Sequence, residues 1–167
     1  MKTLYLLSIL TLALLFASCS RDTKSPVEGN VTSYTDCKNM GEENLKATQD
    51  KDESCIEYNY DAKTQRLSLT HINTGFNCCP GELSAEIHLI ESTIEIIESE
   101  KAPLCACNCL FDMDIEIKNV EPGVYFMKVV EPYCHDQEKL EFEIDLTSST
   151  QGSHCVERTE YPWNTPF

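Results

Sequence analysis

Apolar and polar residues alternate with a period of two along much of this chain. Ile56, Tyr58 and Tyr60 alternate with acidic and amide residues, and Leu67 and Leu69 alternate with hydroxyl-bearing residues. Successive side chains of a β-strand point to opposite faces, so each stretch predicts a strand with one buried face. The short polar segment between the two stretches predicts a turn, and the two strands are therefore expected to form a hairpin.

The same alternation recurs further along the chain. Residues 111–117 and residues 124–130 each read as a strand, and the segment between them contains Pro122-Gly123. This pair is expected to form a hairpin, because Pro-Gly marks a turn. A last strand is predicted over residues 140–146, and the residues beyond Thr147 are polar enough to be expected in a tail.

The segment 83–100 carries two competing patterns. Its apolar residues fall at helical spacing, at Leu83, Ile87, Ile90, Ile94 and Ile97. However, Ile94 and Ile96 alternate with polar neighbours, and the segment is rich in β-branched residues, which favour strands. We therefore favour two strands joined near residues 91–93, and a helix remains the alternative.

About seven short strands separated by frequent turns are typical of an antiparallel β-sandwich. Val120-Glu121-Pro122-Gly123-Val124-Tyr125, continuing to Val130, resembles the late hairpin of immunoglobulin-like and transthyretin-like sandwich domains. This resemblance implies an all-β fold, an antiparallel immunoglobulin-like β-sandwich of about seven strands. It implies nothing about function.

The N-terminus has the pattern of an export signal. Met1-Lys2 is followed by fourteen uncharged residues from Leu4 to Ala17, a length typical of a secretory signal and shorter than a membrane span. The sequence Phe16-Ala17-Ser18-Cys19 resembles the lipobox of bacterial lipoproteins. The resemblance implies cleavage before Cys19, a lipid on its thiol and a place in the bacterial cell envelope. Anchorage to the outer membrane, on its periplasmic or surface face, is expected, and the inner membrane remains open. The alternative interpretation is an ordinary cleaved signal peptide, with Cys19 lost or structural.

Four regions follow from these patterns. They are a signal peptide over residues 1–18, a lipidated cysteine and flexible tether over 19–30, a β-sandwich domain over 31–157 and a C-terminal tail over 158–167. The tether is polar and contains Pro26 and Gly29, which is typical of a linker.

Nine cysteines follow Cys19, and in an exported protein they are expected to pair. They are Cys37, Cys55, Cys78, Cys79, Cys105, Cys107, Cys109, Cys134 and Cys155. An odd number leaves at least one thiol unpaired. Adjacent cysteines and cysteines two apart are poorly placed to bridge each other. The Cys78-Cys79 loop is therefore expected to be joined by one or two bridges to the loop containing Cys105, Cys107 and Cys109. Cys37 with Cys55 and Cys134 with Cys155 are the remaining expected pairs.

A soft-metal or thiol-redox site is the alternative interpretation of the same cysteines. Cys78, Cys79, Cys105, Cys107 and Cys109 place five sulfurs in two short segments, a density that suits Zn²⁺ or Cu(I). Their spacing differs from that of zinc ribbons, and no C-x-x-C redox motif is present in the sequence. Disulfides are therefore favoured, and no cofactor is expected.

The net charge of the chain and the motifs in its sequence limit the classes of function that can be expected. The chain carries 28 acidic and 13 basic side chains and a formal net charge of −15, so it offers no basic face for nucleic acid. No catalytic motif or phosphate-binding loop occurs in the sequence. We expect a binding or structural module rather than an enzyme, attached to a membrane through its lipid and recognising an unidentified protein or glycan.

Overall fold

The computed structural model describes residues 25–38 and 53–159, which form nine strands. The strands are β1 (Glu28–Tyr34), β2 (Glu53–Asp61), β3 (Arg66–Asn77), β4 (Leu83–Ile90), β5 (Thr93–Glu100), β6 (Asn108–Lys118), β7 (Val124–Val130), β8 (Glu141–Asp145) and β9 (Gln151–Glu157). The expected signal peptide, Cys19 and most of the expected tail lie outside the described residues. No helix in the described ranges has the length and hydropathy needed to cross a membrane.

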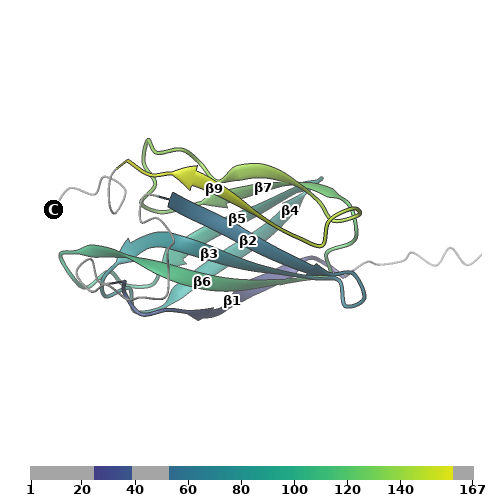
Figure 1. Ribbon diagram of the computed structural model, residues 1–167. Helices are drawn as coiled ribbons and strands as arrows, with labels where there is room; N and C mark the ends of the chain where they lie inside the picture. Colours follow the sequence, from purple (N-terminus) through teal and green to yellow (C-terminus); the bar gives the residue numbers. More distant parts are fainter. Residues whose placement is uncertain (1–24, 39–52, 160–167) are drawn as a thin grey trace, which may run out of the picture.

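The strands form two sheets that pack face to face (Figure 1). The five-stranded sheet has the order β1-β6-β3-β2-β9, and the four-stranded sheet has the order β4-β5-β7-β8. The pairs within the sheets are antiparallel except for β5 and β7, which run parallel. The chain is therefore an all-β protein with a two-sheet, sandwich-like architecture.

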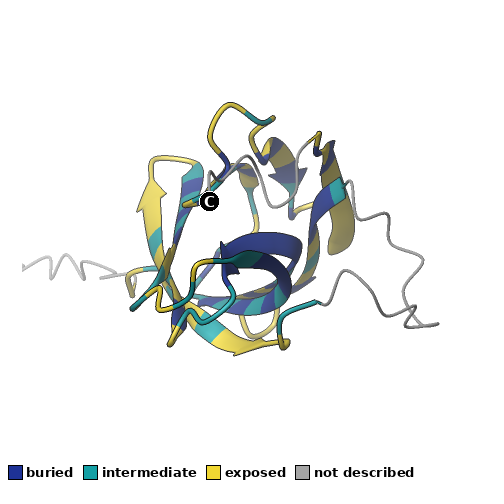
Figure 2. Cartoon of the chain, turned by 90° about the vertical axis from the view of Figure 1, so that its left-hand side faces the viewer, coloured by how far each residue is buried: buried dark blue, intermediate teal, exposed yellow. Residues whose placement is uncertain are grey.

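The core lies between the sheets and consists of the inward-facing residues of both. Ile115 and Ile117 of β6 and Met127 and Val129 of β7 are at most 3% exposed, and the residues between them are more exposed. Viewed along the sandwich, the buried faces of the two sheets turn toward each other (Figure 2). The period-two alternation of the sequence thus corresponds to burial in the structure.

On both sides of the sandwich, the edge strands of the two sheets are in close contact. On one side a side chain at Gly29 of β1 would lie 2.6 Å from Ile87 of β4, so the absence of a Cβ lets these edge strands approach. On the other side the rings of Phe142 in β8 and His154 in β9 stack with centroids 4.5 Å apart. Each edge of one sheet is therefore packed against an edge of the other.

The predicted strands between residues 55 and 146 are present. The segment 83–100 forms two antiparallel strands, β4 and β5, and not a helix. The turn between them contains Glu91 with a φ of 56°, a left-handed backbone conformation. The β2–β3 hairpin is also confirmed.

Three expectations about the fold are wrong. The sheet order contains nine strands rather than about seven, because the polar edge strands β1 and β9 were assigned to tether, loop and tail. The sandwich is not wholly antiparallel, since β5 and β7 are parallel. The strands on either side of Pro122-Gly123 do not form a hairpin, because β6 pairs with β1 and β3 while β7 pairs with β5 and β8.

The segment after β6 therefore carries the chain from one sheet to the other. The Tyr125 hydroxyl donates a hydrogen bond to the carbonyl of Glu121 four residues upstream, at 2.9 Å. The Tyr60 hydroxyl of β2 donates to the carbonyl of Val120, at 2.8 Å. Immunoglobulin-type sandwiches use a comparable tyrosine bond at a crossing between sheets. The two phenols fix the crossing, which explains the Val-x-Pro-Gly-x-Tyr pattern without a hairpin.

Candidate functional site

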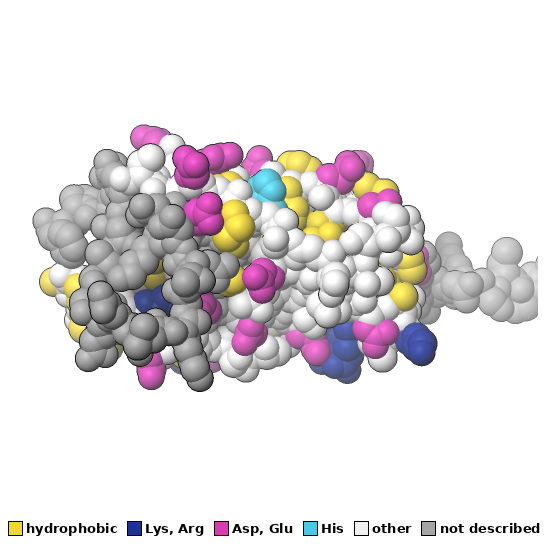
Figure 3. All heavy atoms as spheres, viewed as in Figure 1, with side chains coloured by type: hydrophobic (Ala, Val, Ile, Leu, Met, Phe, Trp, Pro, Cys, Tyr) yellow, Lys and Arg dark blue, Asp and Glu magenta, His cyan; other side chains and the backbone are white. Residues whose placement is uncertain are grey.

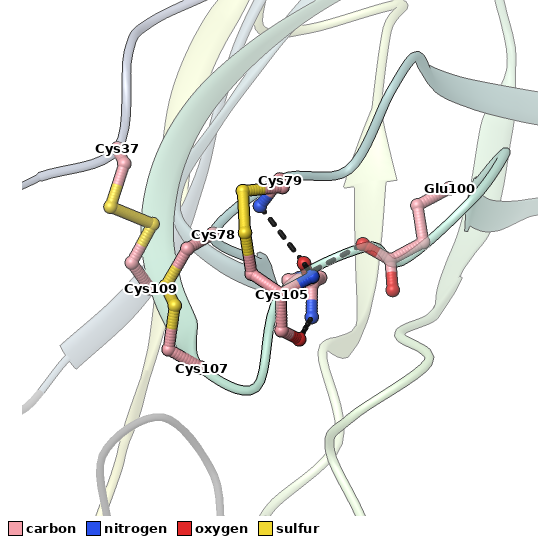
Figure 4. Close-up of a disulfide and its surroundings, with 8 residues drawn as sticks. Cys37, Cys78, Cys79, Glu100, Cys105, Cys107 and Cys109 are labelled. Carbon is pink, nitrogen blue, oxygen red and sulfur yellow. Dashed lines mark hydrogen bonds between the residues drawn. A yellow bond between two sulfur atoms is a disulfide. The ribbon is translucent and has the colours of Figure 1, made fainter.

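Three of the four disulfides among the described residues cluster at one end of the sandwich. Cys78 pairs with Cys107, Cys79 with Cys105 and Cys37 with Cys109. These bonds join the segment after β1, the β3–β4 loop, the β5–β6 loop and the start of β6 (Figure 4). We call this region the disulfide end. The Cys78-Cys79 loop was expected to be joined to the Cys105–Cys109 loop by one or two bridges, and two are present.

Asn77, the last residue of β3, organises the same loops through hydrogen bonds. Its side-chain amide donates to the carbonyl of Cys105, and its side-chain oxygen accepts from the backbone amides of Cys79 and Cys105 (Figure 4). Its own backbone amide donates to the carboxylate of Glu100. The Tyr133 hydroxyl donates to the same carboxylate, and burial, followed by this bond, raises the pKa of Tyr133 to about 12. The loops are therefore held in one conformation by covalent bonds and hydrogen bonds together.

Two expected cysteine pairs are wrong. Cys37 does not pair with Cys55, and Cys134 does not pair with Cys155. Instead, Cys55 of β2 pairs with Cys155 of β9, which lies directly opposite it in the sheet. This pairing could not be predicted from the sequence, because its polar pattern did not indicate that β9 is a strand or that it lies beside β2.

The five cysteines of the proposed soft-metal site are all joined in disulfides. The Sγ atoms of Cys37, Cys78 and Cys109 lie within 4.8 Å of one another, because two bridges are neighbours here. A metal binds thiolate sulfur, so these atoms would have to be reduced before they could act as ligands. The observed arrangement favours disulfides.

A layer of polar side chains lies inside the sandwich beneath the disulfide end. Its members belong to strands of both sheets or to the segments after β7 and β9, and each is at most 8% exposed: Ser54, His71, Thr74, Glu98, Glu131, Cys134 and Arg158. We call this set the polar layer. Most members occupy the next inward-facing position of a strand, two residues beyond its buried apolar residues, as Glu98 follows Ile94 and Ile96 in β5. Apart from Cys134, none of them was predicted to form a site, although a charged residue in phase with a buried apolar series is a visible signal in the sequence.

A bulge in β3 brings two members of the polar layer to the same carboxylate. The pairing of β3 with β6 shifts between His71 and Thr74, and Asn73 has a φ of 60° there. In a regular strand these two residues would face opposite sides, but the shift turns both inward. His71 Nδ1 lies 2.6 Å from one oxygen of Glu98, and the Thr74 hydroxyl donates to the other at 2.9 Å.

The polar layer is balanced in charge. Arg158 Nη2 donates to both carboxylate oxygens of Glu131, at 2.7 and 2.9 Å, and His71 Nε2 lies 3.8 Å from the same group. Burial alone lowers the pKa of His71, but Glu98 and then Glu131 outweigh it, so that this pKa is raised overall. The raised pKa of His71 thus follows from its two acidic neighbours, and the pairing of His71 and Arg158 with Glu98 and Glu131 offsets part of the cost of burying these groups.

Ser54, His71 and Glu98 are hydrogen-bonded in the order found in serine hydrolases. The Ser54 Oγ lies 2.9 Å from His71 Nε2, and His71 Nδ1 is held by Glu98. However, Ser54 and His71 are 0% exposed, so a substrate has no path to the hydroxyl. The arrangement therefore serves structure rather than acyl transfer.

Cys134 is the unpaired cysteine among the described residues. Its Sγ lies 3.3 Å from Arg158 Nη1 and it is 2% exposed. Burial, followed by the Glu131 carboxylate, raises the pKa of Cys134, which keeps the thiol protonated. Since the thiolate is the reactive form, this cysteine is unsuited to nucleophilic or redox chemistry.

Stability is expected to fall as the pH rises through the folded-state pKa of His71. Because that pKa is raised, its contribution is fully present below the unfolded value of about 6.5, and it amounts to about 1.4 kcal/mol per pKa unit of difference. Urea denaturation between pH 6 and pH 9 measures the change. The variant His71→Gln should have a flatter profile than the parent protein over this range. Equal slopes for the two proteins would show that His71 is not the titrating group.

Comparisons with known proteins identify no relative: no family model, curated protein or solved structure matches the chain.

Proposed function

We propose that the protein is a lipoprotein of the bacterial cell envelope, anchored to the outer membrane through an acylated Cys19, and that its sandwich is a binding module. The observation that supports this most directly is that the two ends of the sandwich differ. The chain enters at one end, and the disulfide-stapled loops lie at the other. A lipid at Cys19 would thus leave the disulfide end facing away from the membrane.

The entry point is defined by contacts of the first described residues. The Asn119 side chain, in the turn after β6, donates to the carbonyl of Pro26 at 2.8 Å, and Ser25 and Val27 line a cavity with Gln65 of the β2–β3 turn. Cys19 precedes Ser25 by six residues, a reach of at most about 20 Å. The eleven residues of β6 span about 36 Å from the disulfide end to this turn. A short tether would therefore hold one end close to the membrane and the other well clear of it.

The disulfides support an oxidising compartment. In the described ranges eight cysteines form four bridges, a density typical of exported proteins and rare in the cytosol. Together with the lipobox-like sequence, this favours the cell envelope.

A binding role fits the scaffold better than catalysis does. The described polar layer is buried, burial raises the pKa of its thiol, and its serine has no exposed surface through which a substrate could reach it. Rigid sheets and cross-linked loops, by contrast, present surfaces with little conformational freedom to lose on binding. An immunoglobulin-like relationship is part of this proposal, supported by the tyrosine bonds at the crossing between sheets.

Metabolic labelling with a palmitate analogue tests the anchor. The full-length protein, expressed in a Gram-negative host, should incorporate label, fractionate with the outer membrane and give a mature N-terminus at Cys19. The Cys19→Ala variant should lose the label and the membrane association, and Cys134→Ala is the matched control that should retain both. Label that persists in Cys19→Ala, or an unlabelled parent protein, would contradict the proposal.

A further inference from the structure

We propose that a groove on the outer face of the five-stranded sheet binds a neutral oligosaccharide. This inference rests on the proposed binding function and assigns it a site and a class of ligand. The groove has a volume of about 530 Å³ and crosses strands β9, β2 and β3. Such a volume lies within the range of small-molecule sites in proteins.

The sheet register brings the polar side chains of the groove together. Gln151, Asn59 and Ser68 lie directly opposite one another across β9, β2 and β3. Two residues away, Ser153, Glu57 and Thr70 form a second row on the same face. Two adjacent rows thus present hydroxyl, amide and carboxylate groups over three strands.

Side chains in the groove differ from those on β6 of the same face. On β6 the carboxylates are engaged: Asp112 with Lys38, Asp114 with Ser33 and Thr70, and Glu116 with Arg66 and Lys118. In the groove, within the described part of the chain, five side chains make no hydrogen bond: Glu57, Asn59, Ser68, Gln151 and Ser153. These five donors and acceptors are therefore available to a ligand.

The residue types select the class of ligand. The described lining of the groove contains no Lys, Arg or His, so a phosphate or carboxylate would find no opposite charge. It contains one carboxylate, which is too little to favour a polycation. Hydroxyl and amide groups each donate and accept hydrogen bonds, as the hydroxyls of a sugar do. A neutral polyol is the ligand that can use all of these groups.

The groove is also accessible in the anchored orientation. It lies on a lateral face, and Figure 3 shows a broad uncharged area in the middle of this face, between scattered carboxylates. A chain of sugars running past the anchored protein could therefore reach it without displacing either end of the sandwich.

Saturation-transfer NMR on the mature protein tests the inference with four neutral probes: maltotriose, cellotriose, mannotriose and galactotriose. At least one should bind at millimolar concentration. Asn59→Ala and Gln151→Ala should each weaken that binding by about two- to tenfold, the effect of losing one net hydrogen bond. Both side chains are exposed and unbonded, so the variants should remain folded.

The matched control is Asn30→Ala. Asn30 is exposed and lies in the same cross-strand row as Asn59, but on the far edge strand β1. This variant should bind as the parent protein does, and glucose 6-phosphate and glucosamine should bind no more tightly than the neutral probes. Absence of binding by all four probes, equal weakening in Asn30→Ala, or preference for a charged sugar would each overturn the inference. An acylated protein that binds no probe would overturn this inference alone, and an unacylated protein that binds would overturn the anchor alone.

Discussion

Replacing Arg158 by methionine is expected to lower the free energy of unfolding by about 3–5 kcal/mol, because Glu131 would keep a buried charge without its partner. The two side chains are 0% and 1% exposed, and a nitrogen of Arg158 lies 2.7 Å from a carboxylate oxygen of Glu131. Arg158 Nη1 also donates to the carbonyl of Glu138, so the substitution additionally releases the β7–β8 loop. Urea denaturation at pH 7 measures the loss.

Arg66→Met provides the matched control. Arg66 forms an ion pair with Glu116 at the same 2.7 Å, but these side chains are 48% and 25% exposed. Water already solvates such a pair, so its loss should cost less than about 1 kcal/mol. Replacing both members of the buried pair, as in Arg158→Met with Glu131→Met, should restore most of the stability. If Arg158→Met proved no more destabilising than Arg66→Met, the polar layer would not have the energetic role assigned to it.

Local alternation was sufficient to predict the buried strands. Each of β2, β6, β7 and β8 places apolar residues on one face over at least five positions, and burial of that face does not depend on which strand lies alongside. The edge strand β9 lacks this signal, since Val156 is its one fully buried residue. It is a strand because β2 offers hydrogen-bonding partners along its length, and that information is not local.

Pairing between distant segments was likewise outside the reach of the sequence. The parallel pairing of β5 with β7 and the crossing at Pro122-Gly123 depend on how the two sheets stack. Among the disulfides, some pairings could be predicted from the sequence and one could not. The bridges from Cys78 and Cys79 were predictable because they close the ends of a local hairpin, whereas Cys55 meets Cys155 through the pairing of two strands 100 residues apart. The polar layer could have been found by following the alternation one step further, to Glu98 and Arg158.

Removing the Cys55–Cys155 bridge, by changing both residues to alanine, is expected to cost about 4 kcal/mol of stability. This bridge closes a long loop, with a sequence separation of 100, and the loss of loop-closure entropy in the unfolded chain grows with loop length. It also fastens β9, which contributes little buried apolar surface of its own. Urea denaturation under non-reducing conditions measures the change, and a larger m-value would report a more expanded unfolded state.

Removing the Cys79–Cys105 bridge in the same way is the comparison that isolates the entropic cause. The neighbouring Cys78–Cys107 bridge closes almost the same loop, with separations of 26 and 29. With that bridge intact, positions 79 and 105 already lie close together in the unfolded chain, and the hydrogen bonds of Asn77 persist in the folded one. The cost should therefore stay below about 2 kcal/mol. A cost equal to or greater than that of the Cys55–Cys155 variant would mean that the disulfides act mainly through folded-state contacts at the disulfide end, and not by restricting the unfolded chain.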